Sequence, residues 1–141
     1  MVYFLGWIAF LMLIFLSIIH FLWSAGVKWG YKAVLPTDEE NNLKLKPSKI
    51  ITIIIACLLA FTAVLYAVKA KIVTVYFVPN SIVNVGLYIV LVVFFIRSIG
   101  DFKYVGFFKK TKNTMFAKND TKYFSPLCLF LSIISMVILY M

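Results

Sequence analysis

The chain has 141 residues, of which 64% are hydrophobic and 13% are charged, and its formal net charge is +9. A soluble domain is about half apolar and about a quarter charged, and a small domain leaves much of its surface in water. The composition therefore excludes a water-soluble globular fold and predicts an integral membrane protein. The length suits one membrane domain, residues 1–141.

Four apolar runs predict four membrane-spanning helices. The runs cover residues 2–23, 50–68, 82–96 and 125–141. Roughly 20 helical residues cross the hydrocarbon core, so the two shorter runs need their flanking residues as well. The first run follows no Lys or Arg and is longer than a signal-peptide core, so we expect it to stay in the membrane. We expect an all-α fold, a four-helix bundle with helices at about 2–24, 49–68, 81–99 and 125–140.

The basic residues predict how the bundle is oriented. Twelve of the 14 Lys and Arg residues lie between the first and second runs or between the third and fourth. With four crossings, these two segments lie on the same side, and only Lys69 and Lys71 lie opposite them. The positive-inside rule places the twelve in the cytoplasm. We therefore expect a multi-pass protein of the cell membrane with extracytoplasmic N- and C-termini.

The same lysines indicate the partners of the protein. They flank apolar runs, where they meet anionic lipid head groups, so we expect anionic membrane lipids and no nucleic acid. A homo-oligomer or another membrane protein remains open as a partner. Cys57 and Cys128 fall at different depths, and the chain has one His. We therefore expect no disulfide, no metal site and no cofactor.

The first run carries a polar stripe near its cytoplasmic end. Ser17, His20 and Ser24 are spaced three and four residues apart, so they share one face of a helix. Trp23 follows His20 by three residues and leans to the same side. Polar residues on a membrane helix usually face protein rather than lipid, so this face is expected to contact the other helices.

The stretch "RSIGDFKYVGFFKK", residues 97–110, follows the third run. Arg97 and Asp101 are four residues apart and would pair if the helix continued through them. The interleaved aromatic and lysine residues fit an interfacial cytoplasmic segment that lies in the head-group plane. The lysines from 109 to 122 are expected to be ordinary solvated charges of the positive side.

Two further local signals concern turns and helix starts. Ser125 followed by Pro126 predicts an N-cap and a first-turn proline for the fourth helix. The stretch "LPTDEENN", residues 35–42, holds the chain's acidic cluster and predicts a solvated loop tip.

Three stretches resemble a known family. They are "FLGWIAFLMLIFLSIIHFLW", "KWGYKAVLPT" and "RSIGDFKYVGFFKKTKNTMFAKNDTKYFSPLCLF". Together they are similar to the domain-of-unknown-function family numbered 3995, which consists of small bacterial membrane proteins. The resemblance covers nearly the whole chain. It implies a small four-helix membrane protein with no settled activity, and it brings no catalytic residues with it.

All four predicted helices bring polar groups to the cytoplasmic face. His20 ends the first, Lys49 begins the second, Arg97 and Asp101 follow the third, and Ser125 begins the fourth. An ionisable group near hydrocarbon is costly and points to a functional site. The candidate ligand-binding residues are His20, Trp23, Trp29, Arg97, Asp101, Lys103, Asp120 and Tyr123.

Three classes of function fit such a site. The first is binding of an anionic lipid, an amphipathic ligand or a partner at a basic cytoplasmic pocket. The second is an enzyme acting on a lipid or polyprenyl substrate, with His20 and Asp101 as acid and base. The third is a small proton-coupled transporter in which His20 carries the proton. The sequence has no motif for a metal, a nucleophile or a phosphate loop, and the middle of its spans carries no formal charge, so binding is favoured.

Overall fold

The computed structural model describes residues 1–36, 40, 42, 47–76 and 78–141. The predicted acidic loop tip therefore lies largely outside the described residues. Within the described ranges every regular element is helical. The elements are α1 (Val2–Ser24), α2 (Tyr31–Val34), α3 (Lys49–Lys69), α4 (Asn80–Ile99), α5 (Met115–Asn119), the π-helical turn η1 (Asp120–Phe124) and α6 (Ser125–Tyr140).

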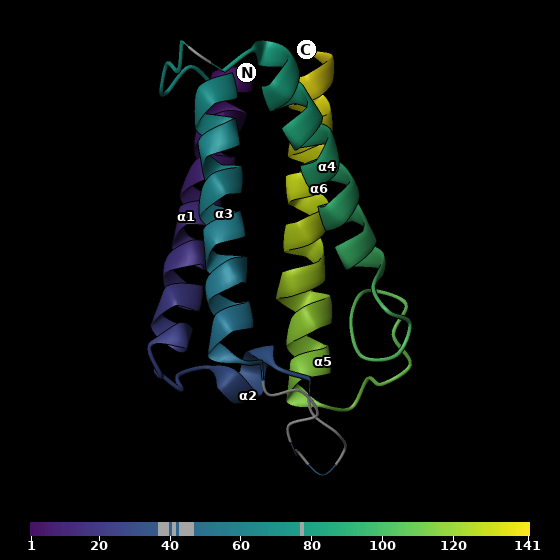
Figure 1. The fold of residues 1–141 in the computed structure, drawn as a ribbon. Coiled ribbons are helices and arrows are strands. Elements are labelled where there is room, and N and C mark those ends of the chain that lie inside the picture. Colours follow the sequence, from purple (N-terminus) through teal and green to yellow (C-terminus); the bar gives the residue numbers. More distant parts are fainter. Residues whose placement is uncertain (37–39, 41, 43–46, 77) are drawn as a thin grey trace.

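Four of these helical stretches are long and apolar enough to cross a membrane. They are α1, α3, α4 and the continuous stretch Met115–Tyr140, which contains α5, η1 and α6. The four long helices run alongside one another, and both termini lie at the same end of the bundle (Figure 1). Their outward faces expose large apolar side chains, as expected for surfaces that contact lipid. The prediction of an all-α, four-helix membrane protein is confirmed.

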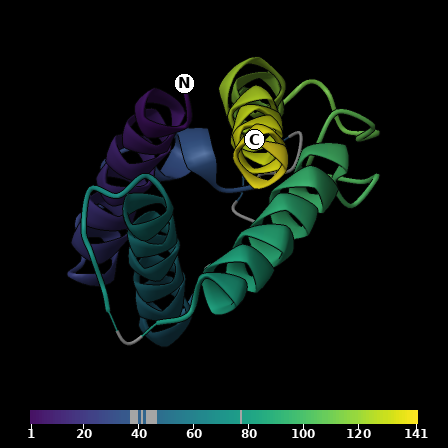
Figure 2. The same ribbon diagram turned by 90° about the horizontal axis from the view of Figure 1, so that it is seen from above.

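The bundle consists of two antiparallel hairpins, α1 with α3 and α4 with α6 (Figure 2). Small residues line the first hairpin, and Ala9, Ala56 and Ala63 are fully buried. A Cβ on Gly6 would overlap the Cβ of Ala70, so the backbone of α1 at Gly6 packs directly against the end of α3. Small residues allow such an approach in lipid, where helix association depends on close packing.

Buried hydroxyl groups link the helices. Ser17 in α1 donates to the carbonyl oxygen of Ala56 in α3 at 2.8 Å, which agrees with the predicted protein-facing stripe. Tyr66 in α3 and Ser135 in α6 share a hydrogen bond. Between α4 and α6, Ser132 donates to the carbonyl of Leu91 at 3.2 Å. Because lipid offers no hydrogen-bond partners, each hydroxyl must be satisfied inside the bundle.

The fourth helix begins earlier than predicted. The expected N-cap at Ser125 is wrong, because the chain enters the helix at Met115, where the hydroxyl oxygen of Thr114 accepts from the N–H of Ala117 at 3.1 Å. The helix then passes through the π turn η1 and continues across Pro126. A proline ring ordinarily clashes with the carbonyl four residues earlier. Here that residue is Lys122, which lies inside the wider π turn.

Candidate functional site

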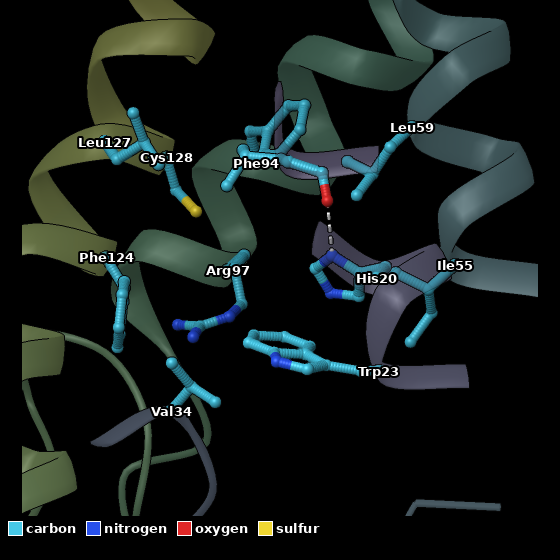
Figure 3. A pocket seen from close by; sticks show the side chains of 11 residues that line it. His20, Trp23, Val34, Ile55, Leu59, Phe94, Arg97, Phe124, Leu127 and Cys128 are labelled. Atoms are coloured by element: carbon cyan, nitrogen blue, oxygen red, sulfur yellow. Dashed lines mark hydrogen bonds between the residues drawn. The ribbon is translucent and has the colours of Figure 1, made fainter. Parts of the chain in front are cut away.

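A cavity of about 250 Å³ lies between the two hairpins, and we call it the inter-hairpin cavity. It lies at the end of the bundle that carries α2, α5 and the segment 100–114, which we call the basic end. Side chains from α1, α2, α3, α4, η1 and α6 surround it (Figure 3). Most of the wall is apolar, and the polar groups come from His20, Trp23, Arg97 and Cys128.

His20 and Trp23 form the α1 side of the cavity. The Nδ1 atom of His20 lies 2.8 Å from the carbonyl oxygen of Leu16. A carbonyl can only accept, so Nδ1 carries a proton, and Nε2 is the acceptor nitrogen of the neutral ring. The indole of Trp23 packs against the imidazole edge at 5.0 Å between centroids. Its Nε1 donates to the carbonyl oxygen of Trp29 at 2.8 Å, which ties the end of α1 to the following turn.

Arg97 enters the cavity from the last turn of α4. Figure 3 shows its guanidinium between the indole of Trp23 and Phe124, with its terminal nitrogens on the Phe124 side. Its Nη2 donates to Oδ1 of Asp120 at 3.1 Å. Its Nη1 is buried and has no hydrogen-bond partner in the described part of the chain. A buried donor without an acceptor is costly, so this atom marks a place where an acceptor would be stabilising.

Asp120 holds the basic end together, and we call it and its partners the Asp120 cluster. The side chain is fully buried, and its Oδ2 accepts from the N–H of Gly106 at 2.7 Å, Nζ of Lys109 at 3.0 Å and the hydroxyl of Ser125 at 3.2 Å. With Arg97 on Oδ1, the carboxylate joins α4, the segment 100–114 and α6. The carboxylate lies in the π turn, a rare feature that occurs frequently at functional sites.

Lys109 differs from the solvated lysine that the sequence suggested. It is 3% exposed, and its Nζ donates to the carbonyl oxygen of Gly106 at 2.9 Å, to Asp120 and to Oγ1 of Thr121 at 2.6 Å. An ammonium group has three donors, and all three are used here. The prediction that Lys109 is ordinary surface charge is therefore wrong, because Asp120 compensates the cost of burying it.

The predicted pair between Arg97 and Asp101 is also wrong. The helix ends at Gly100, whose φ of +90° turns the chain away. Asp101 instead accepts at Oδ1 from the backbone N–H groups of Lys103, Tyr104 and Val105, at 2.7 to 2.9 Å. Partial burial opposes ionisation, but these N–H groups outweigh it and hold the pKa of Asp101 below its usual value. Asp101 therefore organises the segment 100–106 and does not line the inter-hairpin cavity.

One comparison with known proteins gave a match. Residues 13–135 match the family model described as "Protein of unknown function (DUF3995)", which covers most of the chain. This chain belongs to the DUF3995 family. Neither a search of curated proteins nor one of solved structures found a match. In the described part of this DUF3995 protein, no three His, Cys, Asp or Glu side chains are grouped to hold a metal ion.

The candidate residues predicted from sequence fall into two groups. His20, Trp23 and Arg97 line the inter-hairpin cavity, and Asp120 is bound to Arg97. The others lie elsewhere. Trp29 is 76% exposed, Lys103 lies over the ring of Tyr104, Tyr123 lies beneath Lys122, and Asp101 caps its own loop. The structure thus does not bring His20 and Asp101 together as an acid–base pair in this cavity.

Three residues of this DUF3995 protein were missed from sequence. Cys128 lines the inter-hairpin cavity, and Lys109 and Thr121 contact each other beside Asp120. Cys128 carried a signal, because it follows the start of the fourth apolar run by one helical turn. Lys109 and Thr121 carried none, since a lysine and a threonine in a basic loop are ordinarily exposed.

Proposed function

We propose that this protein binds an amphipathic anion, a membrane lipid with an acidic head group, in the inter-hairpin cavity. One observation carries the proposal: Arg97 lines a mostly apolar cavity, and its Nη1 is a buried donor that lacks an acceptor in the described part of the chain. A cation beside an apolar wall matches a molecule that is anionic at one end and apolar at the other. The cavity volume of about 250 Å³ suits a head group and part of one chain.

The charges of the Asp120 cluster support this ligand. The cluster contains two cations, Arg97 and Lys109, and one anion, Asp120. One positive charge remains, and a head-group phosphate or carboxylate would neutralise it. Arg is the residue best suited to such a group, because its planar fork donates two parallel hydrogen bonds to one anion. Asp120 holds one edge of the fork, so the guanidinium is already oriented before the ligand arrives.

His20 gives the cavity a second polar contact. In the uncharged form of the ring, Nε2 is an acceptor, because Nδ1 donates to the carbonyl oxygen of Leu16. A head group that carries a hydroxyl can donate to Nε2 while its anionic oxygen binds Arg97. The apolar side chains above them, including Leu59 and Phe94, then contact the first carbons of the acyl chain.

The test is retention of lipid by purified variants in native mass spectrometry. Arg97→Gln should retain at least about tenfold less phosphatidylglycerol than the unaltered chain, because a charged hydrogen bond contributes about 1.5–3 kcal/mol. Arg97→Lys keeps the charge without the planar guanidinium, so it should retain an amount of phosphatidylglycerol between those of Arg97→Gln and the unaltered chain. Lys28→Gln, an exposed lysine outside the cavity, is the charge-matched control.

A second variant separates binding from folding. Leu59→Trp fills the cavity from α3 and leaves the Arg97 and Asp120 contact untouched. It should expel the lipid with the Asp120 cluster intact. If both Arg97→Gln and Leu59→Trp retain phosphatidylglycerol as well as Lys28→Gln does, the cavity is not the lipid site.

The proposal also includes an orientation: the basic end faces the cytoplasm, and the segment 100–114 lies in the head-group plane. In a Cys57→Ala, Cys128→Ala background, Met115→Cys at the basic end should resist a membrane-impermeant thiol reagent in intact cells. Tyr76→Cys, between α3 and α4 at the opposite end and 97% exposed, should be labelled. Labelling at residue 115 with none at residue 76 would show that the orientation is opposite to the one proposed.

A further inference from the structure

A second cavity, of about 410 Å³, lies between the segment 100–114 and the start of the fourth helix. We call it the lysine cavity, because Lys109, Lys112, Lys118 and Lys122 line it. It shares no residue with the inter-hairpin cavity. We propose that the lysine cavity is a binding site for a phosphate monoester, separate from the lipid site.

The lysines converge from two segments that other contacts hold in place. Lys109 and Lys112 come from the loop, and Lys118 and Lys122 come from α5 and η1. The salt bridge between Lys109 and Asp120 joins the two segments. Thr114 fixes the start of α5 by capping Ala117. The fold thus places these four lysines around one cavity.

This convergence is unfavourable without an anion. Lys118 and Lys122 are four residues apart along one helical stretch, a spacing at which like charges repel. No acidic side chain of the described residues lines the cavity. Asp120, whose carboxylate contacts Lys109 beside the cavity, is also bound by Arg97. Lys112, Lys118 and Lys122 therefore bring three positive charges to the lining of one cavity, although Lys122 also lies over the ring of Tyr123.

Thr121 adds a hydroxyl donor. Its Oγ1 accepts from Nζ of Lys109 at 2.6 Å, so its own hydroxyl hydrogen must be donated to another group. Thr121 is exposed and lines the lysine cavity. Lys109 has all three donors engaged, so it serves as a fixed positive wall while Thr121 offers the O–H. A hydroxyl donor beside the lysines that line the same cavity is a set that suits the several oxygens of a phosphate.

The charge favours a monoester over a diester. A phosphate monoester carries about −1.5 to −2 at pH 7, and a diester carries only about −1, so the monoester better matches three lysines. Two sources share this chemistry: a membrane lipid whose head group is a bare phosphate, and a soluble phosphate compound. The cavity lies at the basic end, where either could reach it.

The experiment uses the full chain in nanodiscs and has one arm for each source. In the first arm, inorganic phosphate is titrated into phosphatidylcholine discs and followed by ³¹P NMR. In the second arm, Leu59→Trp, in which the inter-hairpin cavity is filled, is placed in discs that contain phosphatidic acid, and the retained lipid is measured by native mass spectrometry. Saturable phosphate binding in the first arm assigns a soluble compound, and binding in the second arm alone assigns the lipid head group. Both support the site, and the absence of binding in both arms overturns it.

Charge-matched double variants decide whether phosphate binding depends on the lysine cavity or on the overall charge of the protein. Lys118→Gln with Lys122→Gln should weaken binding at least about tenfold, because two charged hydrogen bonds are lost. Lys28→Gln with Lys110→Gln removes the same charge from exposed positions outside the cavity and should weaken it less than about threefold. Equal losses in the two variants would overturn the proposal.

A further variant pair tests the threonine. Thr121→Ser keeps the hydroxyl and should bind as the unaltered chain does, whereas Thr121→Val should bind more weakly. Leu59→Trp, which closes only the inter-hairpin cavity, should leave phosphate binding unchanged. If Leu59→Trp abolishes phosphate binding, the two cavities are one site, and the proposal of a separate site fails.

Discussion

Replacing Asp120 with asparagine should lower the free energy of unfolding by about 3–5 kcal/mol, the usual cost of leaving a buried charge without its partner. The carboxylate is fully buried and accepts from Arg97, Lys109, Gly106 and Ser125. Asparagine has nearly the same shape but carries no charge. Lys109, which is 3% exposed, would then be a buried cation with neutral acceptors only.

The measurement is unfolding of the purified protein in mixed detergent micelles, followed by circular dichroism. Asp101→Asn is the matched control, because Asp101 is exposed and asparagine keeps an oxygen for its backbone contacts. It should lower the free energy of unfolding by about 1 kcal/mol, as the weakening of a cap usually does, because no buried cation is left without its partner. The double variant Asp120→Asn, Lys109→Met should recover part of the loss, because it removes the unpaired ammonium together with the carboxylate.

The same comparison tests how the basic end is held together. If Asp120→Asn and Asp101→Asn unfold alike, the Asp120 cluster does not stabilise the fold. If the double variant is as unstable as the sum of the single changes, Lys109 and Asp120 are not coupled. Either result would remove the structural basis for treating Asp120 as the residue that holds the basic end together.

The spans could be predicted because the thickness of the bilayer sets their length. α1 contains no charged residue, and α3 carries charge only at its first and last residues, Lys49 and Lys69, so their apolar runs ended close to the observed helix ends. The start of the fourth helix could not be found in this way. The residues from Met115 to Phe124 include Lys118, Asp120 and Lys122. Three charged residues in ten predict a loop outside the membrane. Only the contacts of Asp120 show that its charge is compensated inside the protein.

The candidate site was partly predictable for a similar reason. His20 and Trp23 share a helix face, which spacing alone reveals, and Arg97 follows an apolar run directly. The partner of Arg97 could not be read from spacing, because Asp120 is 23 residues away. Asp101, four residues away, was the natural candidate. Gly100 ends the helix before Asp101 can face Arg97, and a turn of this kind redirects every side chain after it.

That turn gives the second large expected effect: Gly106→Ala should unfold the segment 100–110. Gly100 and Gly106 have φ angles of +90° and +91°, and their backbones lie in contact. A Cβ on Gly106 would lie 2.1 Å from the carbonyl oxygen of Ile99, and one on Gly100 would lie 1.8 Å from that of Val105. These neighbours are backbone atoms, so no rotamer change can relieve the overlap.

Gly26→Ala separates this clash from the cost of the backbone angle. Gly26 has a φ of +101°, but a Cβ there would meet nothing within 4 Å. Gly26→Ala should therefore lower the free energy of unfolding only by the strain of a left-handed residue, about 1–2 kcal/mol. Gly106→Ala should cost at least about 2 kcal/mol more, because it also breaks the hydrogen bond from Gly106 to Asp120. Hydrogen exchange should then show loss of protection at the N–H of Phe107, which donates to the carbonyl oxygen of Ser98 at the end of α4, and at the N–H of Lys110, which donates to that of Phe102. If Gly106→Ala and Gly26→Ala are equally stable and equally protected, Gly100 and Gly106 are not in contact. In that case the segment 100–110 does not position Lys109 and Asp120.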